Sequence, residues 1–212
     1  MDSTQIALIL ILIISVILHE MAHGYAANWL GDPTARLQGR LSPNPLVHID
    51  PFMSVILPAL LVISGSHFLF GAAKPVPYNP YNFTNQKWGE AIVAIAGPAT
   101  NIALAIIFAL IIRFADMLPM VSMAFLTLSF QVVILNLFLA FFNLVPIPPL
   151  DGSKILPNFL PFGLRLKYER FRQILEQNIA LAFGVVIIAF MLVLGTPLAL
   201  MTRSVAIFLV GG

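Results

Sequence analysis

Residues 5–30, QIALILILIISVILHEMAHGYAANWL, decide the fold, because this apolar run carries the motif HEMAH at positions 19–23. About 20 helical residues cross a hydrocarbon layer of ~30 Å, so the run is long enough to span a membrane. No Lys or Arg precedes it, and it is too long for the apolar part of a secretory signal. We therefore expect a retained membrane helix with three ionisable side chains inside it.

The HEMAH motif has the spacing of a hydrolytic metal site. His19 and His23 are four residues apart and share one face of a helix, so both imidazoles can bind one Zn²⁺, while Glu20 can activate a water molecule. Such a short pattern also arises by chance. However, each ionisable residue near the centre of a membrane helix costs about 2.5–3.5 kcal/mol, and a divalent cation would compensate all three.

Composition limits the class of protein and the possible ligands. Of 212 residues, 59% are hydrophobic and 9% are charged, which is far from the average soluble domain. The net charge is only +2 and there is no basic tract, so we expect no nucleic-acid partner. Because the chain has no cysteine, any metal must be held by His and carboxylate ligands.

The remaining apolar runs indicate an all-α polytopic membrane protein. Full spans are predicted at 5–30, 91–118, 121–145 and 179–195, with an apolar continuation to the end. A fifth run, 52–70, is interrupted by Pro58 and by SGSH at 64–67, so it is expected to be re-entrant or broken. Without repeats or a long soluble insertion, residues 1–212 are predicted to form a single intramembrane domain.

A third metal ligand is expected from the segment NLVPIPPLDG at 143–152. Its prolines must end the preceding helix and extend the chain, and extended backbone at membrane depth is tolerated where it lines a wet cavity. Asp-Gly alone more often forms an ordinary turn. In this context, beside two histidines, Asp151 is the best candidate ligand, because two His, a carboxylate and water make a common catalytic zinc shell.

Five motifs in this order resemble the site-2 protease family of intramembrane zinc metalloproteases (peptidase family M50), in its compact prokaryotic form without PDZ or CBS domains. They are HEMAH at 19–23, GRLSPNPLVHIDP at 39–51, KPVP at 74–77, GPATN at 97–101 and NLVPIPPLDG at 143–152. The resemblance implies that His19, His23 and Asp151 hold one zinc ion per chain, that Glu20 is the general base and that Asn143 contacts the substrate backbone or the oxyanion. It also implies a short β-hairpin over residues 36–50 beside the active site.

Three of these positions keep an alternative. Asn143 is equally well explained as a helix-packing amide. The GPATN motif lies among alanines and is interpreted as a face for close helix packing. His48 could approach the metal as an extra ligand, but a hydrogen bond to loop backbone is the commoner role of such a residue.

Charge distribution predicts the orientation, since Lys and Arg in short loops mark the cytoplasmic side. If 52–70 re-enters, nine basic residues share one face and two lie opposite, whereas a crossing segment divides them four against seven. The nine are Arg36, Arg40, Lys74, Lys87, Lys154, Arg165, Lys167, Arg170 and Arg172; the two are Arg113 and Arg203. We expect an external N-terminus, an active site near the cytoplasm and a multi-pass location in a prokaryotic cell membrane.

The predicted function is hydrolysis of peptide bonds within or near transmembrane segments of membrane-protein substrates. The expected partners are such a substrate and the lipid bilayer, with the basic, amphipathic segment 154–176 at the lipid surface. Two other classes are possible: a zinc or ion transporter that uses the same His and Asp residues, and a non-catalytic scaffold that binds membrane helices.

Overall fold

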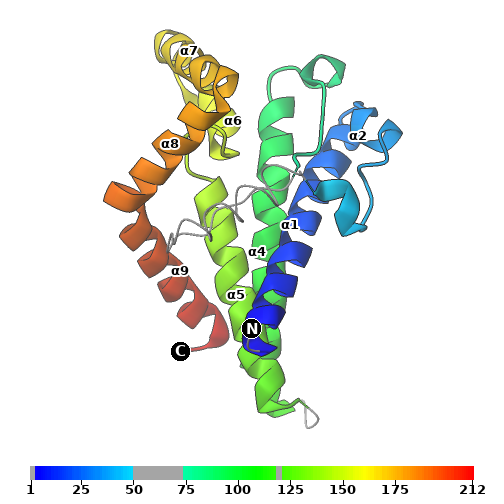
Figure 1. Ribbon diagram of the computed structural model, residues 1–212, viewed down its shortest axis with the longest axis vertical. Coiled ribbons are helices and arrows are strands. Elements are labelled where there is room, and N and C mark those ends of the chain that lie inside the picture. The colour runs from blue at the N-terminus through cyan, green and yellow to red at the C-terminus, as the bar shows by residue number, and fades with distance from the viewer. Residues whose placement is uncertain (1–2, 50–73, 118–120) are drawn as a thin grey trace.

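The computed structural model describes residues 3–49, 74–117 and 121–212, and each regular element in these ranges is a helix. Three single helices, α1 (Ser3–Trp29), α4 (Gly89–Arg113) and α5 (Met123–Asn143), are long and apolar enough to cross a membrane (Figure 1). A fourth candidate span, Ile179–Val210, contains α8 (Ile179–Ala189), the π-helical η6 (Phe190–Leu194) and α9 (Gly195–Val210). This agrees with the expected number of spans.

The outer surfaces of these helices are apolar. Leu10 on α1 is 54% exposed and Leu192 in η6 is 77% exposed, for example. In water such surface would be unfavourable by roughly 25 cal/mol per Å², whereas lipid tails cover it without this cost. Together with the four spans, this makes the chain a multi-pass membrane protein.

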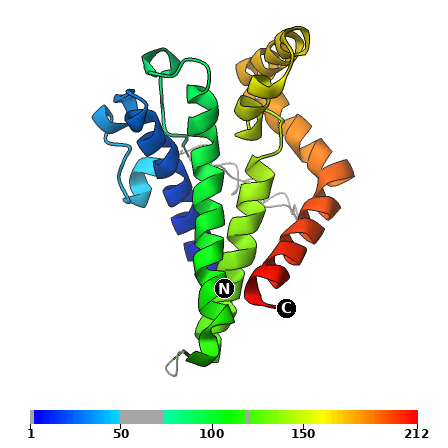
Figure 2. The same ribbon diagram turned by 180° about the vertical axis from the view of Figure 1, so that it is seen from behind.

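Helix α4 lies at the centre of the bundle and packs against both α1 and α5, while α9 packs on α5 (Figures 1 and 2). Small side chains make the close approach possible, because membrane helices associate through close packing between small residues. The core cluster shared by α4, α5 and α9 consists of Ala105, Ala109, Val133, Leu137 and Ala206.

The fourth span is bent at η6, so that α8 and α9 point in different directions (Figure 1). A straight helix over these 32 residues would be about 48 Å long, well beyond a ~30 Å hydrocarbon core. Pro197 has no N–H to donate four residues back and its ring crowds that carbonyl, which favours irregular winding just before it. The sequence prediction ended this span at residue 195, but its apolar continuation is helical to Val210.

Short elements gather at one end of the bundle. The amphipathic α7 (Phe162–Gln177) lies there, beyond α6 (Gly152–Ile155) and the 3₁₀ turn η5 (Leu156–Phe159) (Figure 1). The 3₁₀ turn η3 (Pro80–Asn82) precedes α4 at this end, whereas η4 (Ala115–Met117) follows α4 at its other end. The ion pair between Arg172 and Glu90, with 3.3 Å between nitrogen and oxygen, connects α7 to the start of α4.

The predicted β-hairpin over residues 36–50 is wrong. The described part of this stretch, up to residue 49, contains the end of α2 (Thr34–Leu37) and the 3₁₀ turn η1 (Pro45–His48), and it has no strand. Two prolines explain the difference, because neither Pro43 nor Pro45 can donate to a strand ladder. Instead, the Asn44 side chain accepts from the Leu46 N–H at 3.0 Å and starts the turn. The predicted re-entrant segment 52–70 lies outside the described residues.

Candidate metal centre

Three predicted ligands meet where the C-terminal half of α1 faces the loop that follows α5. His19 and His23 are each 7% exposed and Asp151 is 8% exposed. The two Nε2 atoms are 3.0 Å apart, and the Asp151 Oδ2 atom lies 3.2 Å from His19 Nε2 and 3.3 Å from His23 Nε2. Among the described residues, this is the cluster of His, Asp and Glu side chains that could hold a metal ion.

The second nitrogen of each imidazole determines where its proton lies. His23 Nδ1 is 2.7 Å from the Val93 carbonyl oxygen, and His19 Nδ1 is 2.7 Å from Asn101 Oδ1. The Asn101 amide nitrogen is already directed at Asn136 Oδ1, so the oxygen of Asn101 is the atom that faces His19. Both partners are acceptors, so each Nδ1 carries the proton and each neutral ring presents a lone pair at Nε2.

Two lone pairs and a carboxylate oxygen therefore converge on one buried point, which is unfavourable without a cation between them. Ligands 2.0–2.1 Å from a tetrahedral zinc ion are about 3.3 Å apart. The three observed separations of 3.0, 3.2 and 3.3 Å match that spacing closely. The residues therefore fit a zinc ion with three protein ligands, which leaves a fourth position for water or substrate.

Gly97 on α4 faces the Nε2 atoms of the two histidines. A Cβ atom at this position would lie 2.5 Å from Nε2 of His19 and 2.5 Å from Nε2 of His23, closer than real Cβ contacts come. The missing side chain thus lets α4 approach the cluster. The sequence interpretation of GPATN as a packing motif was incomplete, because the same glycine also lies against both predicted zinc ligands.

Asn101 was missed as a site residue by the sequence analysis. Besides facing His19, it donates to Asn136 Oδ1 at 3.1 Å, and Asn136 donates to Ser15 Oγ at 3.0 Å. Asn101 and Asn136 are fully buried and Ser15 is 3% exposed. This polar chain joins α4, α5 and α1 and ends on the imidazole of His19. The sequence could have indicated its role, because an asparagine inside an apolar helix needs a hydrogen-bond partner from a neighbouring helix.

Asp151 is held in place by the proline-rich loop and by Gly152. A Cβ atom on Gly152 would lie 2.1 Å from the Leu144 carbonyl oxygen, so only glycine fits there. On the neighbouring turn, Lys154 has its Nζ 5.2 Å from the centre of the Tyr78 ring. Burial alone would lower the pKa of Lys154, but Tyr78 and Asp151 raise this pKa above its ordinary value. Lys154 is therefore an ammonium group close to the Asp151 carboxylate.

Glu20 follows His19 on α1 and is partly buried. Its Oε2 accepts a hydrogen bond from the Val76 N–H at 2.9 Å. Because Pro75 and Pro77 have no N–H, Val76 supplies the amide donor of this extended tripeptide. A backbone N–H of the KPVP motif thus donates a hydrogen bond to Glu20, the residue predicted to be the general base.

Arg40 fixes the KPVP segment beside α1. Arg40 is 7% exposed, and its guanidinium donates to the carbonyl oxygens of Lys74 at 2.7 Å and Pro75 at 3.3 Å, and also to that of Val47. The Lys74 N–H donates to the His48 carbonyl oxygen at 2.8 Å. These bonds connect the loop after α2 to the segment that contacts Glu20.

His48 and Asn143 lie outside the cluster of His19, His23 and Asp151. The His48 ring is buried and its Nε2 lies 2.8 Å from the Ser42 carbonyl oxygen, which is the backbone role weighed in the sequence analysis. Asn143 is the last residue of α5, and its amide donates to the Leu139 carbonyl oxygen at 2.9 Å. An amide has two N–H donors, so one remains for another partner.

A family model described as peptidase family M50 matches residues 112–194. YwhC of Bacillus subtilis, a candidate zinc metalloprotease, is 42% identical over 166 residues, which cover 76% of this chain and 72% of the relative. Rip2 of Mycobacterium tuberculosis, also a candidate zinc metalloprotease, is 31% identical over 150 residues, 70% of this chain and 56% of Rip2. A zinc metalloprotease of Methanocaldococcus jannaschii is 28% identical over 149 residues, 70% of this chain and 33% of that protein. No solved structure matches the chain.

Proposed function

The chain belongs to peptidase family M50 and is an intramembrane zinc metalloprotease, and from this premise we propose that it hydrolyses peptide bonds within or next to transmembrane segments of other membrane proteins. The observation that carries the proposal is the convergence of His19 Nε2, His23 Nε2 and Asp151 Oδ2 in a buried position between membrane helices. A buried catalytic site of this kind suits a substrate that arrives through the lipid.

We propose that these three atoms hold one zinc ion per chain. Zinc bound there supplies Lewis-acid activation of the scissile carbonyl and of the attacking water. Asn101 and the Val93 carbonyl hold the two imidazoles in the tautomer that leaves Nε2 free to bind. Gly97 keeps the space in front of both nitrogens open.

Glu20 is proposed to act as the general base. It follows a ligand directly on α1, so its carboxylate can take a proton from the attacking water and return it to the leaving amine. The Val76 N–H donates to one Glu20 oxygen, which fixes the carboxylate and leaves its second oxygen for proton transfer. Asn143 is proposed to donate its remaining N–H to the substrate backbone or the oxyanion.

Val76 offers a further role for the KPVP segment. Pro75 and Pro77 keep it extended, and an extended segment can bind an unwound substrate strand through backbone hydrogen bonds. A helical substrate hides its scissile carbonyl in a hydrogen bond within its own chain, so unwinding must precede cleavage. We expect helix-breaking residues near the cleaved bond for this reason.

We propose that the metal centre lies toward the cytoplasm and that the N-terminus is external, in a prokaryotic cell membrane. The basic loops counted on the cytoplasmic side occur where α7 and the ends of α1 and α5 gather (Figures 1 and 2). On α7, Phe162 and Ile174 are exposed, which suits an amphipathic helix at the lipid surface. A reporter fused at Thr84 is expected to be cytoplasmic, and an external signal would reverse this orientation.

The test of function compares wild-type protein with Glu20→Gln in a cleavage assay on a single-span peptide. Both proteins should retain zinc, because Glu20 is not among the ligands, but only the wild type should cleave. A transporter would need Glu20 mainly for its charge, so in that case the metal affinity should change instead. Cleavage by Glu20→Gln at the wild-type rate would refute the assigned base.

A further inference from the structure

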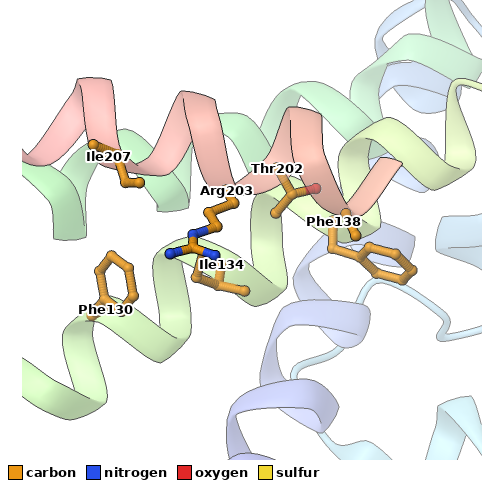
Figure 3. Close-up of a pocket in the computed structure, with 7 residues that line it drawn as sticks. Phe130, Ile134, Phe138, Thr202, Arg203 and Ile207 are labelled. Atoms are coloured by element: carbon orange, nitrogen blue, oxygen red, sulfur yellow. The ribbon is translucent and has the colours of Figure 1, made fainter. Parts of the chain in front are cut away.

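A groove runs between α5 and α9 and is drawn in Figure 3. Its volume is about 570 Å³. The lining residues, which define the α5–α9 groove, are Phe130, Ile134, Phe138, Ala199, Thr202, Arg203 and Ile207. Apart from Thr202 and Arg203, they are apolar. None of His19, His23 and Asp151 lines it, so this groove is distinct from the proposed active site.

Arg203 is the unusual member of the groove. It lies in the middle of α9, and its guanidinium points toward α5 between Phe130 and Ile134 (Figure 3). Among the described residues, no carboxylate lies within ion-pair distance of it, whereas Arg165 has Glu169 at 2.7 Å. An unpaired charge on a membrane helix is costly and marks a functional position, so an anion is expected from outside the described residues.

The groove also restricts the shape of that anion. Two phenylalanine side chains and two isoleucine side chains make a trough that suits a long apolar chain, while Arg203 supplies one positive charge. A guanidinium matches phosphate through two parallel hydrogen bonds. Arg203 is seven residues before the end of α9, about 10 Å along the axis, so its long side chain can reach toward the headgroup level.

We propose that the α5–α9 groove is a binding site for an anionic phospholipid. The phosphate pairs with the Arg203 guanidinium, and one acyl chain lies along Phe130, Ile134 and Phe138. A substrate helix fits these observations less well, because carboxylates that could neutralise Arg203 are rare in membrane helices. The proposal is independent of the proteolytic function and does not rest on the assigned membrane orientation.

The experiment is native mass spectrometry of the full chain in detergent, titrated with phosphatidylglycerol or with phosphatidylcholine of the same acyl chains. The wild type should retain one phosphatidylglycerol in preference to phosphatidylcholine, because the cationic choline group offsets the phosphate charge and is repelled by Arg203. In Arg203→Gln the affinity for phosphatidylglycerol should fall about tenfold or more, since hydrogen bonds to charged groups are lost. The matched control is Arg113→Gln: this arginine ends α4 beside Gly211, outside the groove, and its loss should leave binding unchanged.

A second variant tests the groove without changing the charge. Ala199 is exposed and lines the groove, so Ala199→Phe fills the trough and should also reduce phosphatidylglycerol binding. This variant decides the question if Arg203→Gln does not fold. Equal binding of both lipids by the wild type, or wild-type binding in the two groove variants, would overturn the proposal. Displacement of the lipid by a single-span peptide would overturn it in favour of a helix-docking site.

Discussion

The substitution Gly97→Ala tests the structure of the metal centre with one added methyl group. Gly97 is buried on α4, and a Cβ atom there would lie 2.5 Å from the Nε2 atoms of both His19 and His23. Those nitrogens are the atoms proposed to bind zinc. The added methyl group therefore clashes with both imidazole rings. The three side chains proposed to bind zinc are themselves unchanged.

The expected effect can be estimated from this distance. Ordinary Cβ contacts begin at 3.4 Å, so α4 or the two rings must move by about 0.9 Å. Metal sites tolerate ligand displacements of only about 0.2 Å. We expect zinc affinity to fall by about 100-fold, the upper end of the effect of losing a group that orients the ligands, and cleavage to fall with it.

The assay is competition for zinc with a chromogenic chelator in detergent, together with thermal unfolding of the same samples. Gly184→Ala is the matched control, because Gly184 is also in a membrane helix and its added Cβ would meet nothing within 4 Å. It should bind zinc like the wild type and gain roughly 0.5–1 kcal/mol in helix stability. Wild-type zinc affinity in Gly97→Ala would refute the proposed ligand geometry.

Three further substitutions test other parts of the account. Asn101→Leu removes the acceptor of His19 Nδ1 and should weaken zinc binding by about 10- to 100-fold in the same chelator competition. Gly152→Ala would place a Cβ 2.1 Å from the Leu144 carbonyl oxygen and should lower both the unfolding temperature and the zinc content. Asp32 is fully buried; burial alone would raise its pKa, but hydrogen bonds from Thr34 and neighbouring groups lower it below 3.8. Its contribution to stability is therefore complete above this value and is lost as pH falls through the folded pKa. Asp32→Asn should accordingly be less stable than the wild type at pH 7, with a difference in unfolding temperature that shrinks toward pH 3.

The membrane spans and the shared helix face of the two histidines were predictable because both depend on local sequence. A run of about 20 apolar residues is sufficient to indicate a membrane helix, and a spacing of four residues places His19 and His23 on one face. Asp151 was predicted from its proline context, and the structure brings it within 3.3 Å of both imidazoles. Its role as a ligand remains a prediction.

The contribution of α4 to the metal centre was not predictable from the sequence. Whether Gly97 and Asn101 face His19 or another neighbour depends on how α4 is rotated against α1, and this rotation is set by packing between the helices. The hairpin expected over residues 36–50 followed from family resemblance, whereas the local prolines Pro43 and Pro45 favour turns. Local backbone chemistry was the better guide in that segment.

The central claim is that His19, His23 and Asp151 hold zinc inside the membrane domain. Its most direct test is the zinc content of purified wild-type protein measured beside Asp151→Ala, with folding checked by thermal unfolding. We predict about one zinc ion per wild-type chain and clearly weakened binding in Asp151→Ala, since two imidazoles alone make an incomplete site. Wild-type protein that folds and binds no zinc, or Asp151→Ala that binds it unchanged, would contradict the account.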